Sequence, residues 1–519
     1  MSTRVAIRFN PEPRVRFRDN PILIAQAQRR LKPSQFIPTL AVAGISATCA
    51  LIFAVATNDA SAPKTLTLGY LIAIQVALLL RGSVSVANAL VADAASGVLE
   101  FHRVTPTSSP TDALGYIFGA PAREYLVAAT LLPFTVVAGT WAQLPLVPFL
   151  EALVATATTA FVFHAIAALT ALVAPKRANA AAGVVFFGIT AYALGAALSE
   201  VGVPLLAHLT TYPSLERLFS DSGAADPIVF VGAPIPSFLF TVAVDTCAFG
   251  FALHGCTRKL ANPARPATSR FGAIGLFVIA VVLGIGSSWT AAEDAVGASG
   301  SAIVLSYLLG SALVAMLTSG ALVPSYLAVT RGIRRARRRG DHVGWFDDQG
   351  AGWPLALGFS VVVSGGFGML AFAMRRGFAS DHLVSMNMVW AVLSVATLIL
   401  LLTSTVEFLR LCRRKSLGGS ALLIGFALTV FPLLLMGIFS ALKIDSAERY
   451  AAALSPLFGL LATAVRAASV WSIDYEAPPF AADGAAVLFS HVVAVAVIVF
   501  FQIQVTLVRR RLTLSLGPR

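Results

Sequence analysis

The chain has 519 residues, of which 57% are hydrophobic and 12% are charged, and its mean hydropathy is +0.80. Because soluble domains carry about 25% charged residues, this composition excludes a soluble globular protein. Four cysteines exclude a disulfide scaffold, and the net charge of +13 has to be explained by where the basic residues lie.

Twelve windows of the sequence are apolar and long enough to cross a bilayer, which takes about 20 residues. A polar stretch of about 35 residues precedes the first window, which has full length and so reads as a spanning helix rather than a cleavable signal peptide. The sequence therefore predicts an all-α polytopic membrane protein of about twelve transmembrane helices. In chain order the predicted spans are 37–57, 66–86, 125–142, 147–174, 179–198, 235–256, 271–289, 302–328, 353–374, 387–408, 417–441 and 485–508.

The basic residues are unequally distributed between the two sides of these spans. With the N-terminus in the cytoplasm, 31 of the 38 lysines and arginines lie on the cytoplasmic side and seven on the external side. The positive-inside rule then places both termini in the cytoplasm. We expect a multi-pass protein of the plasma membrane. The 32 arginines against six lysines suggest a GC-rich bacterial genome, and hence a bacterial inner membrane.

The spans form two sets of six with a similar order of long and short loops. We predict a cytoplasmic N-terminus with an interfacial elbow helix over 1–35, a first six-helix half over 36–270 and a second over 271–519. In each half, a long external stretch between the fifth and sixth spans holds a short apolar segment with a proline, 203–208 and 451–464. These two segments read either as re-entrant elements or as amphipathic loops on the outer surface.

The connection after the second span carries the most informative motif. The Thr-Pro and Ser-Pro pairs in it end one short element and begin the next, which suits a helix displayed below the membrane. The segment reads Asp93-Ala-Ala-Ser-Gly97-Val-Leu99-Glu100-Phe-His-Arg-Val-Thr105-Pro106-Thr-Ser-Ser109-Pro110, then Leu114-Gly115.

This segment resembles the "G-T-L-E … T-P-x-S" segment of ABC type-2 transporter permeases. Asn20-Pro21-Ile22-Leu23 likewise resembles the family's interfacial "N-P-x-L" elbow helix. Three features depart from the family pattern: the elbow has glutamine in place of its usual acidic residue, the charged run before Gly97 is reduced to Asp93, and Tyr116 replaces a lysine. The resemblance covers about residues 20–262 and extends to the second half by topology and by the segment 324–339.

The resemblance implies a permease subunit, by family an exporter, whose segment 93–124 docks on an ATPase. In the second half, Arg334 and Arg335 belong to a run of six arginines over 331–339. That run reads either as a second docking surface or as an anchor on anionic membrane lipid. The ATPase-coupling residues implied in the first half are Gly97, Leu99, Glu100, Thr105, Pro106, Ser109 and Pro110.

The chain lacks the phosphate-binding loop G-x-x-x-x-G-K-[ST], because none of its six lysines follows a glycine. We therefore expect no catalytic residue and no cofactor in this chain, which is not itself an enzyme. ATP and Mg²⁺ are expected on two copies of a partner ABC ATPase. Nucleic acid is not an expected partner, because no basic patch is interleaved with aromatic residues.

Two other functions compete with the permease interpretation. Asp245 lies within the sixth span, where an ionisable group costs at least about 2.5 kcal/mol and marks a candidate functional residue. It fits a proton-coupled secondary transporter, or else a carboxyl group bonded to a hydroxyl of a neighbouring helix. The external pair Glu293-Asp294 fits a membrane enzyme or a solvated loop. His164 and His491 read as hydrogen-bonded core residues, and no metal site is expected.

Overall fold

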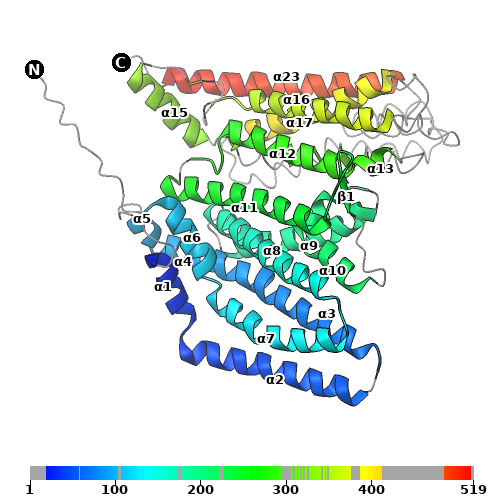
Figure 1. The fold of residues 1–519 in the computed structure, drawn as a ribbon. Helices are drawn as coiled ribbons and strands as arrows, with labels where there is room; N and C mark the ends of the chain where they lie inside the picture. Colours follow the sequence, from blue (N-terminus) through cyan, green and yellow to red (C-terminus); the bar gives the residue numbers. More distant parts are fainter. Residues whose placement is uncertain are drawn as a thin grey trace, which may run out of the picture. The chain divides into compact units, whose positions relative to one another are not determined.

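A computed structural model describes residues 19–57, 59–102, 107–173, 177–200, 202–220, 227–263, 265–293, 326–340, 350–375, 386–411 and 484–515, together with isolated positions between 303 and 347. These residues are almost entirely helical (Figure 1).

Nine helices in the described ranges are long and apolar enough to span a membrane. Each coincides with a predicted span, so the prediction of an all-α polytopic membrane protein is confirmed. Of the other predicted spans, 179–198 lies in α9 (Arg177–Glu200), 302–328 is described only at isolated positions, and 417–441 lies outside the described residues. The nine are α2 (Pro33–Thr57), the continuous helix α3 (Ala62–Gln75), η2 (Val76–Gly82) and α4 (Ser83–Ala95), α7 (Ala122–Trp141), α8 (Leu146–Val173), α11 (Ser237–Ala261), α12 (Arg270–Ser287), α16 (Trp353–Arg375), α17 (Met386–Leu411) and α23 (Gly484–Ser515).

The second spanning helix is longer than its predicted bounds of 66–86. It is one helical segment from Ala62 to Ala95, which is 34 residues. At 1.5 Å per residue this is about 51 Å, against about 30 Å for the hydrocarbon core of a bilayer. The helix therefore extends beyond the membrane, and its last part, α4, packs on α8 and on α6 (Ser109–Gly119).

A π-helical turn, η2, interrupts this long helix at Val76–Gly82. His164 of α8 fits against it, with its Nε2 atom 2.8 Å from the carbonyl oxygen of Leu78. A Cβ atom on Gly82 would lie 2.4 Å from that nitrogen, so only glycine fits there. The turn thus lets a buried histidine bond to the backbone of the neighbouring helix.

Shorter elements join the spans. Two short strands, β1 (Ile228–Phe230) and β2 (Ala233–Ile235), form an antiparallel hairpin. Its turn residues, Val231 and Gly232, have φ of 53° and 83°, as in a type I′ turn. Because this hairpin and Pro236 precede it, α11 begins at Ser237 rather than at the predicted residue 235. The shorter elements are α1 (Pro21–Arg30), α5 (Val98–His102), α6, η3 (Pro204–Leu209), α10 (Tyr212–Phe219), β1 (Ile228–Phe230), β2 (Ala233–Ile235), α13 (Trp289–Glu293) and α15 (Tyr326–Arg339).

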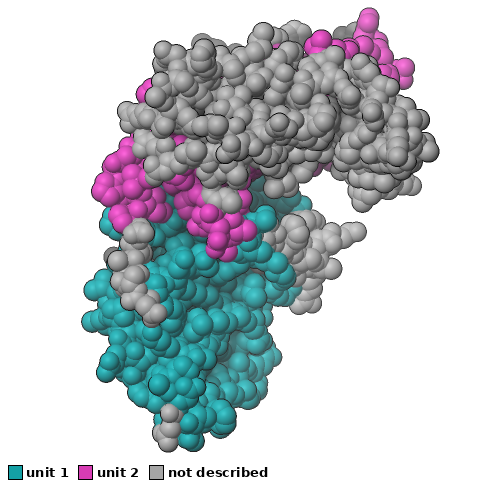
Figure 2. All heavy atoms as spheres, turned by 90° about the vertical axis from the view of Figure 1, so that its right-hand side faces the viewer, with its two compact units in different colours: residues 1–195, 207–226, 236–267 teal, residues 196–206, 227–235, 268–519 magenta. Residues whose placement is uncertain are grey.

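Two compact units divide the chain (Figure 2). Unit 1 comprises residues 1–195, 207–226 and 236–267, and unit 2 comprises the rest. The main division, between residues 267 and 268, lies beside the predicted boundary at 270. The division of the spans into two halves of six stays a prediction.

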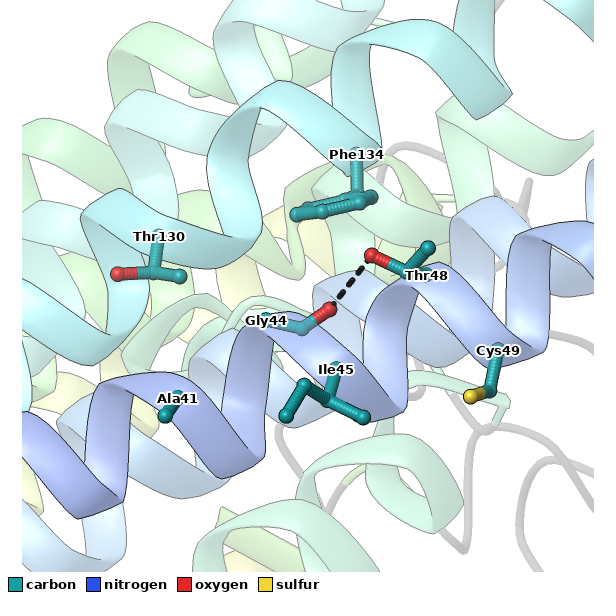
Figure 3. Close-up of a pocket in the computed structure, with 7 residues that line it drawn as sticks. All are labelled: Ala41, Gly44, Ile45, Thr48, Cys49, Thr130 and Phe134. Atoms are coloured by element: carbon teal, nitrogen blue, oxygen red, sulfur yellow. Dashed lines mark hydrogen bonds between the residues drawn. The ribbon is translucent and has the colours of Figure 1, made fainter.

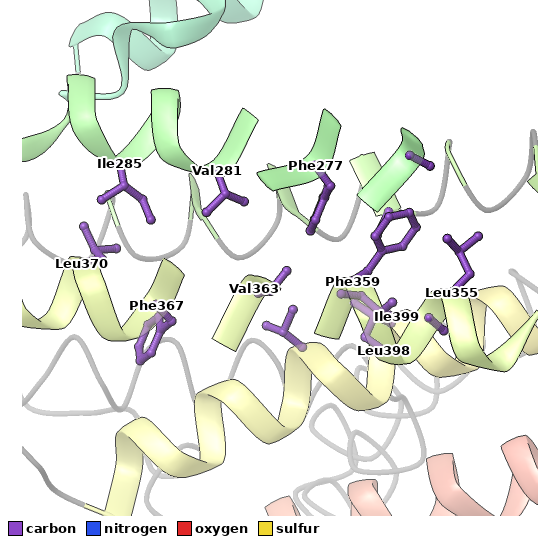
Figure 4. Packing of buried hydrophobic residues seen from close by; sticks show 14 of the residues in the cluster. Phe277, Val281, Ile285, Leu355, Phe359, Val363, Phe367, Leu370, Leu398 and Ile399 are labelled. Atoms are coloured by element: carbon purple, nitrogen blue, oxygen red, sulfur yellow. The ribbon is translucent and has the colours of Figure 1, made fainter. Parts of the chain in front are cut away.

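Each unit has its own helix-packing core. In unit 2, Phe277 and Val281 of α12 face Phe359 and Val363 of α16, at four-residue spacing on both helices (Figure 4). The rings of Phe277 and Phe359 lie 4.8 Å apart between centroids. In unit 1, the core between α4, α6, α8 and α11 is rich in alanine, which lets these helices approach closely.

Candidate functional site

The helix predicted at Asn20–Leu23 is α1, and it is attached to α6. The Asn20 side chain caps α1, because its Oδ1 atom accepts hydrogen bonds from the backbone N–H groups of Ile22 and Leu23 at 3.0 and 3.3 Å. The same side chain donates through Nδ2 to the carbonyl oxygen of Thr111 at 2.7 Å. One buried asparagine therefore begins α1 and binds it to the first turn of α6.

Two glycines of α6 allow this close contact. A Cβ atom on Gly115 would lie 2.8 Å from Cβ of Ile22, and one on Gly119 would lie 2.8 Å from the carbonyl oxygen of Leu23. The Leu114-Gly115 motif of the sequence thus has a steric role, since a larger residue would separate α6 from α1.

Asp93, near the end of α4, joins three elements. Its carboxylate accepts hydrogen bonds from Gln26 Nε2 at 2.8 Å, from Arg29 Nη1 at 3.0 Å and from the Tyr116 hydroxyl at 2.7 Å. Asp93, Gln26 and Tyr116 are 4%, 4% and 0% exposed. Burial and the bond to the Asp93 carboxylate raise the pKa of Tyr116 well above its usual value. We call these four residues the Asp93 assembly; they bind α1 and α6 to the end of the long helix.

A second carboxylate bonds to α4. Glu124, at the start of α7, accepts hydrogen bonds at 3.0 Å from Ser85 of α4 and from Arg123. Arg30 of α1 donates to the carbonyl oxygen of Ser85 at 3.2 Å. The elements α1, α4, α6 and α7 are therefore bound together by polar contacts that sequence patterns alone do not reveal.

The short helix α5 lies between α4 and α6. Gly97, with φ of +79°, ends α4 in a conformation that favours glycine. Leu99 is buried at 6% exposure, whereas Glu100 lies on the surface and Phe101 beside it is 64% exposed. The segment thus anchors one apolar side chain and presents an acidic and an aromatic one outward.

The other predicted coupling residues of the first half have different positions. Thr105 and Pro106 lie outside the described residues. Ser109 and Pro110 form the first turn of α6, which is capped by Ser108 through a 3.4 Å bond from the Thr111 N–H to its hydroxyl.

In unit 2, the arginine run forms the amphipathic helix α15. Its apolar side, including Val329 and Ile333, packs on the ends of α17 and α23. Arg334 and Arg335 are exposed on the other side. This arrangement fits both interpretations of the run, a docking surface and a lipid anchor.

A polar network in unit 2 was missed by the sequence analysis. Glu407 of α17, which is fully buried, accepts hydrogen bonds from Arg509 of α23 at 2.9 Å and from the backbone N–H of Gly352 at 2.9 Å. Arg270 of α12 and Arg509 both donate to the carbonyl oxygen of Gly350, at 2.7 and 2.8 Å. The available signal was an acidic residue near the end of an apolar helix.

Asp245 lies on α11, 1% exposed, with the Thr158 and Thr159 hydroxyls of α8 at 2.7 and 3.1 Å from its Oδ2 atom. Glu293 ends α13, and Asp294 lies outside the described residues. The predicted core histidines are hydrogen-bonded: His491 Nε2 lies 2.9 Å from the Ser394 hydroxyl. Within the described ranges, no group of three acidic, histidine or cysteine residues is placed to hold a metal ion.

An open apolar groove of about 500 Å³ lies between α2 and α7 (Figure 3). Gly44 and Thr48 of α2 line one side and Phe134 of α7 the other. The hydroxyl of Thr48 donates to the carbonyl oxygen of Gly44 at 2.8 Å, so it offers no donor to a ligand. The groove contains no pair of groups suited to acid–base or nucleophilic chemistry.

The fold defines a multi-pass membrane protein of apolar helices, in which the Asp93 assembly lies at the end of a helix longer than the hydrocarbon core of a bilayer. Comparison of the chain with family models, with curated proteins and with solved structures finds no match.

Proposed function

We propose that the chain is the transmembrane subunit of an ATP-driven transporter of the ABC type-2 permease class, an exporter coupled to a separate ATPase. The observation that carries the proposal is the Asp93 assembly. It binds the elbow helix α1 and the segment 93–124 to a helix that extends beyond the membrane. A rigid element attached to a spanning helix is what a soluble ATPase needs in order to move that helix.

The membrane arrangement belongs to this proposal. It has twelve helices in two halves of six, both termini in the cytoplasm, and a location in the bacterial plasma membrane. The support is the bias of 31 basic residues against seven, which favours one orientation. In that orientation α4, α5, α6 and α15 all lie on the cytoplasmic side, where an ATPase is present.

In the proposed mechanism, the ATPase contacts the exposed Glu100 and Phe101 of α5. Its closure on ATP and Mg²⁺ displaces α5 and α6 together, because Leu99 is buried and α6 is bound to α1 by Asn20. The bond from Tyr116 to Asp93 passes this displacement to the long helix and opens a path through the membrane. A second ATPase copy would use Arg334 and Arg335 on α15.

The test is capture of the tagged chain from native membranes in mild detergent, with identification of the proteins that co-purify. We expect a soluble ATPase with a phosphate-binding loop. Glu100→Arg should lower its recovery or its stimulation, while Glu216→Arg, an equally exposed acid on α10, should not. Equal recovery with both variants would reject the docking site, and no ATPase in any preparation would reject the permease proposal.

The buried Asp245 favours a second candidate, a proton-coupled secondary transporter. This candidate predicts transport that persists without ATP and is lost in Asp245→Asn. The permease proposal predicts that transport stops when ATP is withdrawn. The two are therefore separated by one measurement, the dependence of transport on ATP in sealed vesicles.

A further inference from the structure

The surroundings of Asp245 are informative about its protonation state. The side chain lies in the interior of unit 1, where α11 packs on α8. Thr158 and Thr159 are its hydrogen-bonding partners through Oδ2, and its Oδ1 atom is buried without a partner. Among the ion pairs of the described residues, none includes Asp245.

The hydrogen atoms of this contact can be counted. The Thr158 Oγ1 atom lies 2.7 Å from Asp245 Oδ2 and also 3.1 Å from the carbonyl oxygen of Ala155, one turn earlier on α8. A threonine hydroxyl has one hydrogen, so it cannot donate in full to a carbonyl oxygen and to a carboxylate. For both contacts to be full two-centre hydrogen bonds, two hydrogens are needed, and Asp245 is the group that can carry the second.

A carboxylic acid satisfies the whole arrangement. The Oδ2–H group of Asp245 donates to Thr158, whose own hydrogen goes to the Ala155 carbonyl. The unpartnered Oδ1 atom is then a neutral carbonyl oxygen rather than half of an anion. Leaving one neutral acceptor unpaired costs far less free energy than burying an isolated carboxylate.

Within the part of the chain that the structure describes, no charge close to Asp245 compensates an anion there. Arg217 of α10 is bound to Glu151 of α8 at 2.5 Å. His208 of η3 bonds to Thr241, one turn before Asp245 on α11, and burial lowers the pKa of this histidine to about 4, so it is neutral. The remaining titratable or charged groups of the described residues on α11 and on the elements packed against it, together with Tyr192 of α9, are acidic, neutral or at the far end of α11: Asp112, Tyr116, His164, Tyr192, Tyr212, Glu216, Cys247, His254, Cys256, Arg258 and Lys259.

We propose that Asp245 is an intramembrane proton-binding site, and that the bound proton holds α11 against α8 by completing the chain from Asp245 to Thr158 to Ala155. Loss of the proton would remove one hydrogen from this chain and leave an uncompensated anion between two apolar helices. Proton occupancy therefore strengthens or weakens the packing of α11 on α8 around Asp245, while the alanine-rich core farther along these helices stays in contact. This inference does not rest on the permease proposal, because it holds whether or not an ATPase binds.

Infrared spectroscopy of the full-length protein in lipid tests the proposal without any transport assay. At neutral pH we expect the carbonyl stretch of a protonated carboxyl group, shifted by ¹³C labelling of aspartate side chains and absent in Asp245→Asn. The control is Glu151→Gln, which removes a carboxylate that is ion-paired on α8 and should leave the band unchanged. A wild-type difference spectrum that shows only carboxylate bands for Asp245 would overturn the proposal.

A second variant keeps the test decisive if Asp245→Asn does not fold. Thr158→Val removes the acceptor of the proposed O–H group, so the carbonyl band should stay but move to a higher frequency. Thr158→Ser keeps the hydroxyl and should restore the wild-type frequency. A band that is unchanged in Thr158→Val would show that Thr158 does not bind the proton, and would reject the proposed chain.

Discussion

Replacing Asp93 by alanine is the sharpest perturbation of unit 1. The variant removes three hydrogen bonds, but the free-energy costs of losing them differ. Tyr116 and Gln26 are 0% and 4% exposed, so each is left with a buried donor that has no acceptor, at about 1–3 kcal/mol each. The side chain of Arg29 is 56% exposed and returns to water, so it adds little.

The expected loss is therefore about 2–6 kcal/mol, with α1 and α6 released from the end of the long helix. In a thermal unfolding assay on the purified protein this corresponds to a fall in the unfolding midpoint of about 5–15 °C. Limited proteolysis should at the same time cut first near α1 or α5. Asp59→Ala is the matched control, because Asp59 is an exposed carboxylate bonded only within its own loop to Ser61.

The losses of stability in related variants should also follow an order. Tyr116→Phe removes one of the two buried bonds and should cost about half as much as Asp93→Ala. Equal midpoints for Asp93→Ala and Asp59→Ala would refute the claim that this carboxylate binds the elbow helix to the long helix. If Asp93→Ala has a normal unfolding midpoint but is cleaved early by protease, the bond stabilises α1 and α6 locally and not the whole unit.

Three further predictions concern other contacts. Gly115→Ala should lower the unfolding midpoint through overpacking of about 1–3 kcal/mol, whereas Gly69→Ala, with open space around it, should be neutral or stabilising. Arg509→Ala leaves Glu407 buried without its cation and should cost about 3–5 kcal/mol by chemical denaturation, while Glu407→Gln should cost less. Acidification from pH 7 to 5 should lower the free energy of unfolding by about 2 kcal/mol, because His208 is neutral in the folded protein and protonates near pH 6.5 in the unfolded chain. In His208→Asn, the free energy of unfolding should change less with pH, by that same amount.

The spans could be predicted because bilayer thickness fixes the length of an apolar helix whatever its neighbours are. The end of the second span could not. The predicted span ends at residue 86, but the helix continues to Ala95 because α8 and α6 cover its apolar side. A polar residue in a sequence window does not reveal whether a partner elsewhere in the chain will satisfy it.

The candidate site could likewise be predicted only where the contacts are local in sequence. The local pattern predicted that the Thr-Pro and Ser-Pro pairs end one short element and begin the next, since prolines and helix caps act within a few residues. The partners of Asp93 lie 67, 64 and 23 residues away in sequence. The Glu407 network likewise depends on Arg509, which is 102 residues distant. Such contacts follow from tertiary packing, which a single sequence does not specify.

The three departures from the permease pattern meet at one point in the structure. The elbow, which contains Gln26 and Gln28, has glutamine where an acidic residue is usual in that family, the charged run before Gly97 is reduced to Asp93, and Tyr116 replaces a lysine. Gln26 and Tyr116 both donate to Asp93, at 2.8 and 2.7 Å. Two neutral donors suit a single buried carboxylate, because a second acid beside it would repel and a buried lysine would need its own desolvation. Taken singly, each substitution weakens the resemblance; taken together, they form one mutually compatible set of contacts in which Arg29 supplies the compensating charge.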